Sequence, residues 1–287
     1  MSLRSLRVGR IPYLNALPFR ASGKGAGLRS GAGLRNGAGS GGDEPLWTTA
    51  PPRRLGQLTA RGVLDAALLA SRDALALEPA FVPLGDLGIA SSGPVASVLL
   101  FSERPLATLG AARVALTGES RTSRALLRLL LRGPLGIGEP TFVEESEPAE
   151  ARLLIGDRAL AARAAARTPY LLDLGEAWQR WTGLPFVWAR WVVRRGVGAD
   201  AARALEARLG AALRTPPRLP RVLPAGVDRA AARAYLARFT YQLGPAEKAG
   251  LERFAKELAD HDLLQHPARG SHPGPKAGRR ACPRAPA

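Results

Sequence analysis

The chain has few of the residues on which several common kinds of catalysis depend. Its single cysteine, Cys282, lies in a Pro/Arg-rich stretch, which excludes an internal disulfide and disfavours a thiol nucleophile. No histidine precedes His261, and no paired cysteines or His/Glu pairs have metal-ligand spacing. Phosphate-binding GxxxxGK loops and GxSxG nucleophile elbows are also absent. These absences weigh against metal-dependent hydrolysis, nucleotide chemistry and serine hydrolysis, and we expect no metal and no cofactor.

Long apolar runs are missing too. No stretch comes near the ~18 apolar residues that a membrane-spanning helix needs. The N-terminal residues lack the apolar core and the cleavage site of a secretory signal. We therefore expect a cytoplasmic protein with no membrane partner. At 287 residues and 46% hydrophobic composition, the chain can bury one large core or two smaller ones.

The charge of the chain is strongly one-sided, with a formal net charge of +17. Residues 1–60 carry nine basic and two acidic residues (+7), and residues 262–287 carry five basic and one acidic (+4). Most of the excess is therefore terminal, which is a poor basis for a nucleic-acid-binding surface. We expect a small anionic ligand and no nucleic-acid partner.

Two segments have the composition of chain outside a folded domain. Residues 23–42 repeat a Gly-Ala-Gly-Leu-Arg-Ser/Asn unit with little apolar content, which predicts a flexible insertion. The stretch 263–287 is rich in Pro, Gly and Arg and is predicted to be a disordered tail.

Between these segments, short apolar runs alternate with helical patterns, which is typical of an α/β fold with mostly parallel strands. The predicted strands are Val8–Pro12, Ala66–Ala70, Phe81–Leu84, Val95–Ser102, Arg113–Thr117, Ala151–Ile155, Tyr170–Leu172 and Phe186–Val193. The predicted helices are Thr122–Leu131, Asp157–Arg167, Glu176–Thr182, Ala199–Leu213, Asp228–Leu236 and Pro245–Ala259.

Four polar turns follow or interrupt apolar runs in this pattern. Ligands of open α/β sheets collect at such turns, because helix N-termini offer unpaired N–H groups there. The residues of interest in these turns are Tyr13 and Asn15; Ser91, Ser92 and Gly93; Ser120, Arg121, Thr122 and Ser123; and Gly156 and Asp157.

Each of these residues also has an ordinary structural interpretation. Asn15 and Asp157 could simply be helix N-caps, and Arg121 could face solvent. Arg121 nevertheless stands among three hydroxyls at a helix start, which suits a carboxylate or a phosphate. Ser97 lies within an apolar strand pattern, so its hydroxyl needs a partner or a ligand there. The aromatic group from Trp178 to Trp191 is more typical of a core than of a cofactor site.

Six stretches, taken in order, resemble a known family. They are "VGRIPYLNALP", "LDAALLAS", "LGIASSGPVASVLLFS", "VALTGESRTSRALLRLLL", "LLIGDRAL" and "DLGEAWQRWTGLPFVWARWVVRR". Together they resemble the chorismate dehydratases of the futalosine pathway of menaquinone biosynthesis, over roughly residues 7–260.

The resemblance implies a two-lobed, type II periplasmic-binding-protein-like α/β fold with mostly parallel sheets and a ligand cleft between the lobes. The implied division is lobe one from 1–94 and 192–262, lobe two from 95–191, and a tail from 263–287, with "GPVASVLLF" and "PFVWARWVV" as the crossing strands. The insertion at 23–42 occupies the place where the family continues into a second strand, which leaves that strand without a clear counterpart.

The same resemblance implies removal of water from chorismate, a dianion, to give 3-[(1-carboxyvinyl)oxy]benzoate. The implied catalytic residues are Asn15, Ser97 and Asp157. The ring proton would go to Asp157 or to a carboxylate of the substrate, and we favour the substrate, with Asn15 and Ser97 orienting it. The implied substrate-binding residues are Tyr13, Ser91, Ser92, Gly93, Ser120, Arg121, Thr122, Ser123 and Gly156.

Two alternatives remain open from the sequence. The chain could be a non-catalytic binding protein for a small aromatic carboxylate, or the sister enzyme of the pathway that acts on cyclic dehypoxanthinyl futalosine. The "PYLN" stretch favours the dehydratase.

Overall fold

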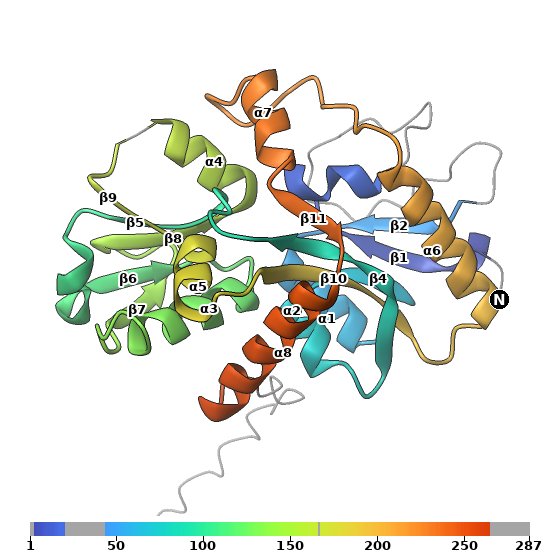
Figure 1. Ribbon diagram of the computed structural model, residues 1–287, viewed down its shortest axis with the longest axis horizontal. Coiled ribbons are helices and arrows are strands. Elements are labelled where there is room, and N and C mark those ends of the chain that lie inside the picture. Colours follow the sequence, from blue (N-terminus) through green and yellow to red (C-terminus); the bar gives the residue numbers. More distant parts are fainter. Residues whose placement is uncertain (1–2, 21–43, 166, 265–287) are drawn as a thin grey trace, which may run out of the picture.

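Two lobes lie side by side in the computed structural model, which describes residues 3–20, 44–165 and 167–264 (Figure 1). The insertion predicted at 23–42 and nearly all of the predicted tail lie outside these residues. The first lobe is built on a six-stranded sheet and the second on a five-stranded sheet.

The first sheet has the strand order β11-β4-β10-β3-β1-β2. Its strands are β1 (Arg7–Arg10), β2 (Leu46–Thr49), β3 (Ala66–Ala70), β4 (Phe81–Ser91), β10 (Phe186–Arg194) and β11 (Phe239–Gln242). The helices of this lobe are α1 (Pro52–Ala60), α2 (Ser71–Ala76), α6 (Ala199–Leu213), α7 (Arg229–Leu236), α8 (Pro245–Asp260) and the short 3-10 helices η1 (Leu3–Ser5) and η2 (Leu14–Phe19).

The second sheet has the order β7-β6-β8-β5-β9. Its strands are β5 (Val98–Ser102), β6 (Arg113–Leu116), β7 (Thr141–Glu144), β8 (Ala151–Ile155) and β9 (Tyr170–Asp173). The helices of this lobe are η3 (Leu106–Ala111), α3 (Arg121–Arg132), α4 (Gly156–Ala165) and α5 (Leu174–Thr182).

Apolar patterning explains the elements that were predicted with the right bounds or within one residue of them at each end. All five residues of β3 are buried, because the strand is central in its sheet and covered on both faces. In α3 the leucines are buried and the arginines alternate with them at helical spacing, so one stripe packs inward. Buried apolar side chains of both lobes join in one large cluster, so the lobes share a contiguous core.

Both sheets are mixed, which corrects the expectation of mostly parallel sheets. β1 runs parallel to β2 and to β3, but β10 runs antiparallel to β3 and to β4. In the second sheet β5 is likewise antiparallel to β8 and β9. The reason is that the chain crosses between the lobes. After the crossings, β5 enters the second sheet and β10 enters the first, each running opposite to the strands beside it.

The first crossing runs from β4 to β5 through Ser92–Ser97 and is fixed by Asp173. The carboxylate of Asp173 accepts hydrogen bonds from the backbone N–H groups of Val95 (3.0 Å) and Ala96 (2.7 Å). It also caps α5 by accepting from the N–H groups of Gly175 and Glu176. One buried carboxylate therefore ties the crossing segment to a helix start in the second lobe.

The return crossing lies before β10, at 183–185, where α5 has ended. Within the described part of the chain, β10 pairs only with β3 and β4, both in the first sheet. We therefore keep the division into lobes as a proposal, with the second lobe ending near 182 instead of at 191.

Several elements escaped prediction. α1 and α2 were not predicted, nor were β2, β7 and β11, which are four residues each. β2 is the second strand for which the sequence offered no clear counterpart, and it pairs with β1 from Arg7↔Leu46 to Arg10↔Thr49. None of its residues is buried, so it has no apolar signature to read.

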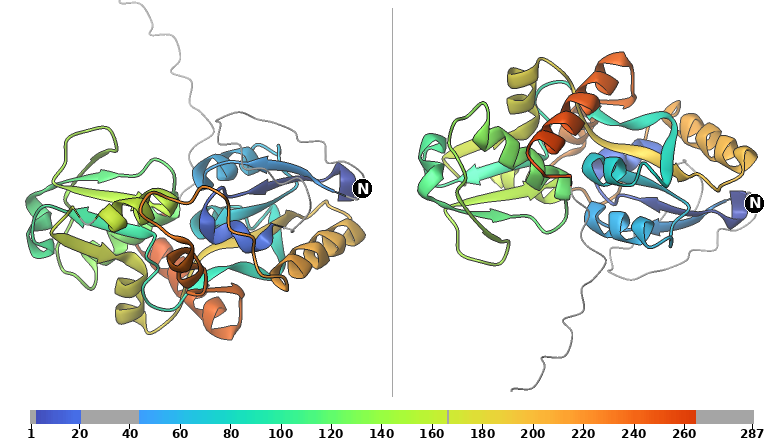
Figure 2. Two further views of the ribbon diagram at one scale, coloured as in Figure 1. Left: turned by 90° about the horizontal axis from the view of Figure 1, so that it is seen from above. Right: turned by 90° about the horizontal axis from the view of Figure 1, so that it is seen from below.

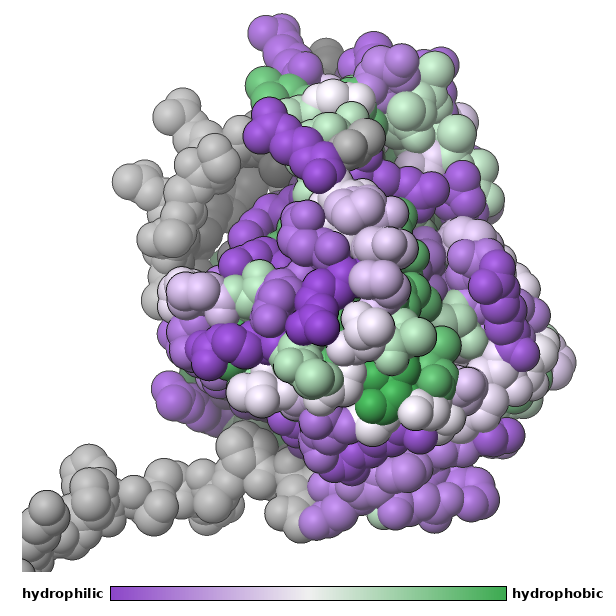
Figure 3. Space-filling model, turned by 90° about the vertical axis from the view of Figure 1, so that its left-hand side faces the viewer, coloured by the Kyte–Doolittle hydropathy of each residue, from purple (hydrophilic) through white to green (hydrophobic). Residues whose placement is uncertain are grey.

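Figure 2 shows the two lobes from above and below, with α8 alongside their junction. α8 packs against β10 of the first sheet and against α3 of the second lobe. Figure 3 looks onto the end formed by the second lobe, where hydrophilic side chains surround a small hydrophobic area. Within the described ranges, no helix combines the length and the apolar character that crossing a membrane requires.

Candidate active site

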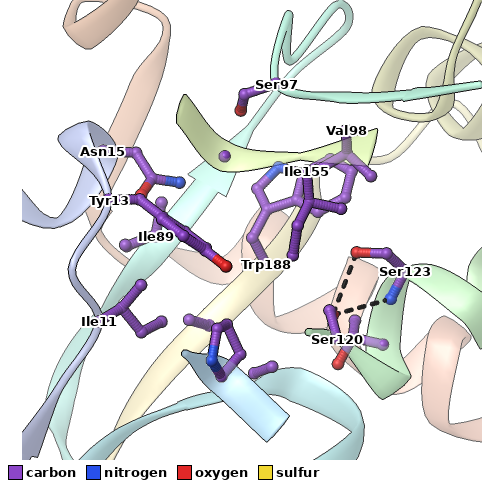
Figure 4. A pocket seen from close by; sticks show the side chains of 15 residues that line it. Ile11, Tyr13, Asn15, Ile89, Ser97, Val98, Ser120, Ser123, Ile155 and Trp188 are labelled. Atoms are coloured by element: carbon purple, nitrogen blue, oxygen red, sulfur yellow. Dashed lines mark hydrogen bonds between the residues drawn. The ribbon is translucent and has the colours of Figure 1, made fainter. Parts of the chain in front are cut away.

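A pocket lies between the two lobes, at the carboxyl ends of several strands (Figure 4). It is a small hollow that is partly open to solvent. Its lining residues are Ile11, Tyr13, Asn15, Pro52, Ala70, Ile89, Ser97, Val98, Ser120, Thr122, Ser123, Ile155, Gly156, Trp188 and Ala189. Since none of these side chains is charged, the pocket can orient an anion only through hydroxyls, amides and helix N-termini.

Asn15 and Ser97 form one polar end of the pocket, and Figure 4 shows them across the pocket from Ser120 and Ser123. Asn15 lies inside η2, so it is not the N-cap that the sequence allowed. Its Oδ1 atom is buried and has no hydrogen-bond partner among the described residues. A buried acceptor without a donor is costly, which makes the Asn15 amide the strongest single indication of an absent ligand.

Ser97 is 1% exposed and accepts a hydrogen bond from the hydroxyl of Tyr235 at 2.7 Å. Burial raises the pKa of Tyr235, so that phenol stays protonated and remains a donor. The sequence predicted Ser97 inside a strand, but the structure places it one residue before β5. Its neighbour Ala96 has a φ of 64°, a left-handed conformation that turns the chain at this point.

Ser120 and Ser123 form the other polar end, at the start of α3 (Figure 4). Ser120 is the N-cap, and its Oγ accepts from the N–H (3.2 Å) and the hydroxyl (3.1 Å) of Ser123. The hydroxyl of Thr122 accepts from the backbone N–H of Arg72 at 3.0 Å, which joins α3 to α2 of the first lobe. The helix start therefore faces the pocket with its positive dipole end and two hydroxyls.

Trp188 separates the two polar ends as part of an apolar wall (Figure 4). Its Nε1–H donates to the Ser91 hydroxyl at 2.9 Å, in a buried contact. Ser91 therefore supports the wall from behind instead of lining the pocket. Trp178, Phe186 and Trp191 are core residues as expected, and Trp188 is the member of that aromatic group that the pocket uses.

Tyr13 closes the pocket from the first lobe. Its hydroxyl donates to the carboxylate of Glu119 in the second lobe at 2.6 Å. Burial, followed by this hydrogen bond, raises the pKa of Tyr13, so the phenol does not ionise near neutral pH. The Tyr13 ring also lies against Gly156, where a Cβ atom would come within 2.8 Å of it.

Asp157 lies behind the pocket lining at the start of α4. Its Oδ1 accepts from the backbone N–H of Leu14 at 2.9 Å, so it holds η2 against the second lobe. Burial raises the pKa of Asp157, while the Leu14 hydrogen bond and the charge of Arg20 oppose that rise. Arg20 is itself partly buried, and this burial lowers its pKa. It donates to the carbonyls of Ile11 and Pro12.

The structure brings seven of the predicted residues together and leaves five away from the lining. Those that line the pocket are Tyr13, Asn15, Ser97, Ser120, Thr122, Ser123 and Gly156. Those that do not are Ser91, Ser92, Gly93, Arg121 and Asp157. Ser92 is exposed and bonds to Gln179, and Gly93 has a φ of 83° in the crossing segment, so both belong to the connection between lobes.

Arg121 requires a correction, because it points away from the three hydroxyls beside it in the sequence. Its Nη1 atom lies 3.0 Å from Oδ1 of Asp73 in α2, a carboxylate that is 2% exposed. Successive helix residues are about 100° apart around the axis, so Arg121 faces the first lobe while Ser120 and Ser123 face the pocket. Among the described residues, the pocket lining contains no arginine that could replace it.

Four supporting residues were missed by sequence reasoning: Trp188, Glu119, Arg20 and Tyr235. The sequence pattern assigns Trp188 to the core, and Glu119 stands inside the "TGES" turn without a distinguishing signal. Tyr235 lies 138 residues from its partner Ser97, and no local pattern links them. Among the described residues, no group of three or more His, Cys, Asp or Glu side chains could hold a metal ion.

Comparison with known proteins identifies relatives over most of the chain. Residues 6–260 match a family model described as menaquinone biosynthesis. A chorismate dehydratase of Thermus thermophilus is 36% identical over 234 residues, covering 73% of this chain and 85% of that protein.

Solved structures share the fold at low sequence identity. An Archaeoglobus fulgidus protein superposes with a TM-score of 0.63 at 16% identity, covering 91% of this chain and 98% of its own. The periplasmic aliphatic sulphonate-binding protein of Escherichia coli gives a TM-score of 0.52 at 13% identity, covering 92% and 94%. These likenesses establish a two-lobed, periplasmic-binding-protein-like fold.

Proposed function

The chain belongs to the menaquinone-biosynthesis family, and from this premise we propose that it is a chorismate dehydratase, a carbon–oxygen lyase that removes water from chorismate. The observation that carries the assignment within the structure is the buried, unpartnered amide oxygen of Asn15 beside Ser97, at one end of an apolar pocket between lobes. The expected product is 3-[(1-carboxyvinyl)oxy]benzoate.

The reaction breaks one ring C–H bond and the bond between C4 and its hydroxyl oxygen. The electron pair of the C–H bond becomes part of the ring π system, and the hydroxyl leaves with a proton as water. Because the ring becomes aromatic, the protein has little chemical work beyond orienting the substrate, positioning the base and helping the hydroxyl to leave. The uncharged pocket is adequate for these tasks.

The two polar ends of the pocket suit the two carboxylates of chorismate. Ser120 and Ser123, at the positive end of the α3 dipole, accommodate one carboxylate. The N–H groups of Asn15 and the hydroxyl of Ser97 orient the other carboxylate. The unpartnered Oδ1 of Asn15 is an acceptor, so it suits the C4 hydroxyl of chorismate, which can donate to it. The apolar wall around Trp188 packs against the ring between them.

A carboxylate of the substrate is the better candidate for the base. Asp157 does not line the pocket, and its Oδ1 already accepts from Leu14. An amide such as that of Asn15 cannot take up a proton at neutral pH, but it can hold a carboxylate in reach of one. We therefore assign Asp157 to positioning η2 and the proton transfer to the substrate itself.

Hydrogen bonds between the lobes surround the pocket. Tyr13 bonds to Glu119, Leu14 to Asp157 and Arg72 to Thr122, and each bond joins the first lobe to the second around the pocket. In a site that is largely shielded from solvent by a bound ligand and these contacts, hydrogen bonds to a charged ligand are stronger than in water.

Incubation of the purified protein with chorismate tests the proposal. Mass spectrometry should show the ligand losing the mass of one water, and the ultraviolet spectrum should become that of a benzoate. Folded protein that binds chorismate without changing its mass would contradict the dehydratase and favour a binding protein for aromatic carboxylates. Turnover of cyclic dehypoxanthinyl futalosine alone would favour the sister enzyme.

The role of Asp157 can be separated from that of the substrate carboxylate. Asp157→Asn keeps an oxygen acceptor for the Leu14 N–H and removes the only proton-accepting function of the side chain. We expect kcat to fall less than tenfold. A loss of several orders of magnitude, with the variant folded and binding the product, would instead identify Asp157 as the base. The cytoplasmic location expected from the sequence remains part of the proposal.

A further inference from the structure

A second hollow lies on the other side of α3 from the pocket, and arginines dominate its lining. Arg121, Arg124 and Arg128 line it from α3, at positions three and four residues apart on one helix face. Arg53 of α1 and Arg72 of α2 complete it, together with Ala125 and Leu263. The hollow is open to solvent.

The five arginines come from both lobes. Arg53 and Arg72 belong to helices that pack on β3 of the first sheet, whereas α3 belongs to the second lobe. α2 and α3 pack against each other where the two lobes meet (Figure 1). The hollow that their arginines line therefore spans this junction. Closing the lobes therefore brings together groups of like charge.

Nearby carboxylates offset only part of this charge, and no acidic residue of the described ranges lines the hollow. Asp73 is buried and takes the ion pair with Arg121 at 3.0 Å and a longer contact with Arg72 at 3.9 Å. Arg124 and Arg128 have only distant, solvent-accessible partners in the described part of the chain, Glu144 at 3.6 Å and Glu139 at 4.0 Å. Such exposed pairs contribute little, so the lining keeps a positive excess.

Arg128 is held in a fixed position on the wall of the hollow. Its Nε atom is buried and lies 4.0 Å from Oε1 of Glu139. Its guanidinium stacks on the ring of Phe142, 4.7 Å from the centroid, which holds it in place beside Arg124. A guanidinium that is fixed in this way and still partly open to solvent is suited to an oxyanion.

We propose that this hollow binds a small multivalent oxyanion of the phosphate or diphosphate class and thereby holds the two lobes together. Guanidinium groups donate pairs of N–H bonds that match the oxygens of such an anion. A diphosphate contacting arginines of both lobes would replace the repulsion between them by a shared attraction. Because Ser120 and Ser123 of the pocket lie on the same helix, the second site would favour the lobe arrangement that encloses the pocket.

Isothermal titration with sodium pyrophosphate tests the site, in buffers matched with sodium chloride for ionic strength. We expect saturable binding at one site per chain. Arg124→Gln/Arg128→Gln should weaken it at least about tenfold, because two charge-assisted contacts are lost. Arg53→Gln should also weaken it, from the other lobe. The control Arg180→Gln/Arg203→Gln removes the same charge from exposed positions on α5 and α6 and should leave the affinity unchanged.

Hydrogen exchange tests the effect on the lobes. Pyrophosphate should slow exchange in the crossing segments 92–97 and 183–185 of the wild type and not of Arg124→Gln/Arg128→Gln. A titration with ADP distinguishes the source of the diphosphate group. Binding of ADP at least tenfold tighter than that of pyrophosphate would indicate a nucleotide, and any weaker binding of ADP than this would indicate an inorganic ligand. Absence of saturable binding, equal weakening by the control pair, or unchanged exchange on saturation would overturn the proposal.

Discussion

The ring of Tyr13 lies directly on Gly156, and this contact joins the two lobes at the pocket. Tyr13 precedes η2 in the first lobe, and Gly156 begins α4 in the second. Gly156 has a φ of 60°, and a Cβ built on it would stand 2.8 to 2.9 Å from three ring atoms of Tyr13. Position 156 therefore needs glycine twice, for its backbone conformation and for the space above it.

Gly156→Ala should destabilise the protein by about 2–4 kcal/mol, since left-handed strain of about 1 kcal/mol adds to overpacking against the ring. Gly183→Ala is the matched control, because Gly183 has a φ of 70° and a Cβ added there would meet no atom of the described residues within 4 Å. It should cost only about 1 kcal/mol and spare activity. Chemical denaturation and kcat/KM measure both effects. Equal losses in the two variants would contradict the role of the Tyr13 contact.

Asn15→Ala should lower turnover of chorismate by about tenfold to a thousandfold, the scale of a lost transition-state contact. Folding should change little, because the buried oxygen of Asn15 has no partner to lose among the described residues. Ser92→Ala serves as the control, since Ser92 is exposed and lies outside the pocket. If the folded Asn15→Ala protein kept the wild-type kcat/KM, Asn15 would have no part in catalysis.

Arg121→Met should act on stability instead of on KM. Removal of the guanidinium leaves the Asp73 carboxylate buried without its closest partner, which costs on the order of 3 kcal/mol. Burial already raises the pKa of Asp73, against the attraction of Arg121. The double variant with Asp73→Asn should recover much of the stability. A large rise in KM at unchanged stability would contradict this prediction and indicate that Arg121 binds the substrate.

Asp65 makes the stability of the first lobe depend on pH. Its side chain is fully buried and accepts hydrogen bonds from Arg7 (2.9 Å) and Arg194 (2.5 Å). Against the opposing effect of burial, these bonds lower the pKa of Asp65 from 3.8 to about 2. A depressed pKa stabilises the folded state above the unfolded value, so the contribution is complete above about pH 4 and is lost as the pH falls toward 2.

The expected contribution of Asp65 at neutral pH is about 2 kcal/mol. Asp65→Asn should therefore unfold more easily at pH 7, and its stability should change less than that of the wild type between pH 4 and 2. Urea denaturation across this range measures the difference. Asp200→Asn, at a side chain that is 97% exposed, should follow the wild-type curve. Parallel curves for wild type and Asp65→Asn would contradict the assignment.

The sequence alone determined the elements whose own residues carry the signal. Residues 66–70 and 199–213 were predicted with the bounds that the structure shows, because one is a short apolar run and the other has a long helical period. The order of six motifs likewise pointed to the family and the two-lobed fold. Asn15, Ser97 and the Ser120–Ser123 turn were found because polar residues stand out beside apolar strands.

Only the tertiary structure decided which of these residues meet and which way they face. Arg121 and Ser120 are adjacent in sequence, yet one pairs with Asp73 and the other lines the pocket. Tyr235 reaches Ser97 across 138 residues, and β2 forms only because β1 offers it an edge. Periodicity along a chain indicates which faces of its helices and strands are apolar. The partner of each face is set by how the two lobes pack, and that packing depends on contacts between residues far apart in sequence.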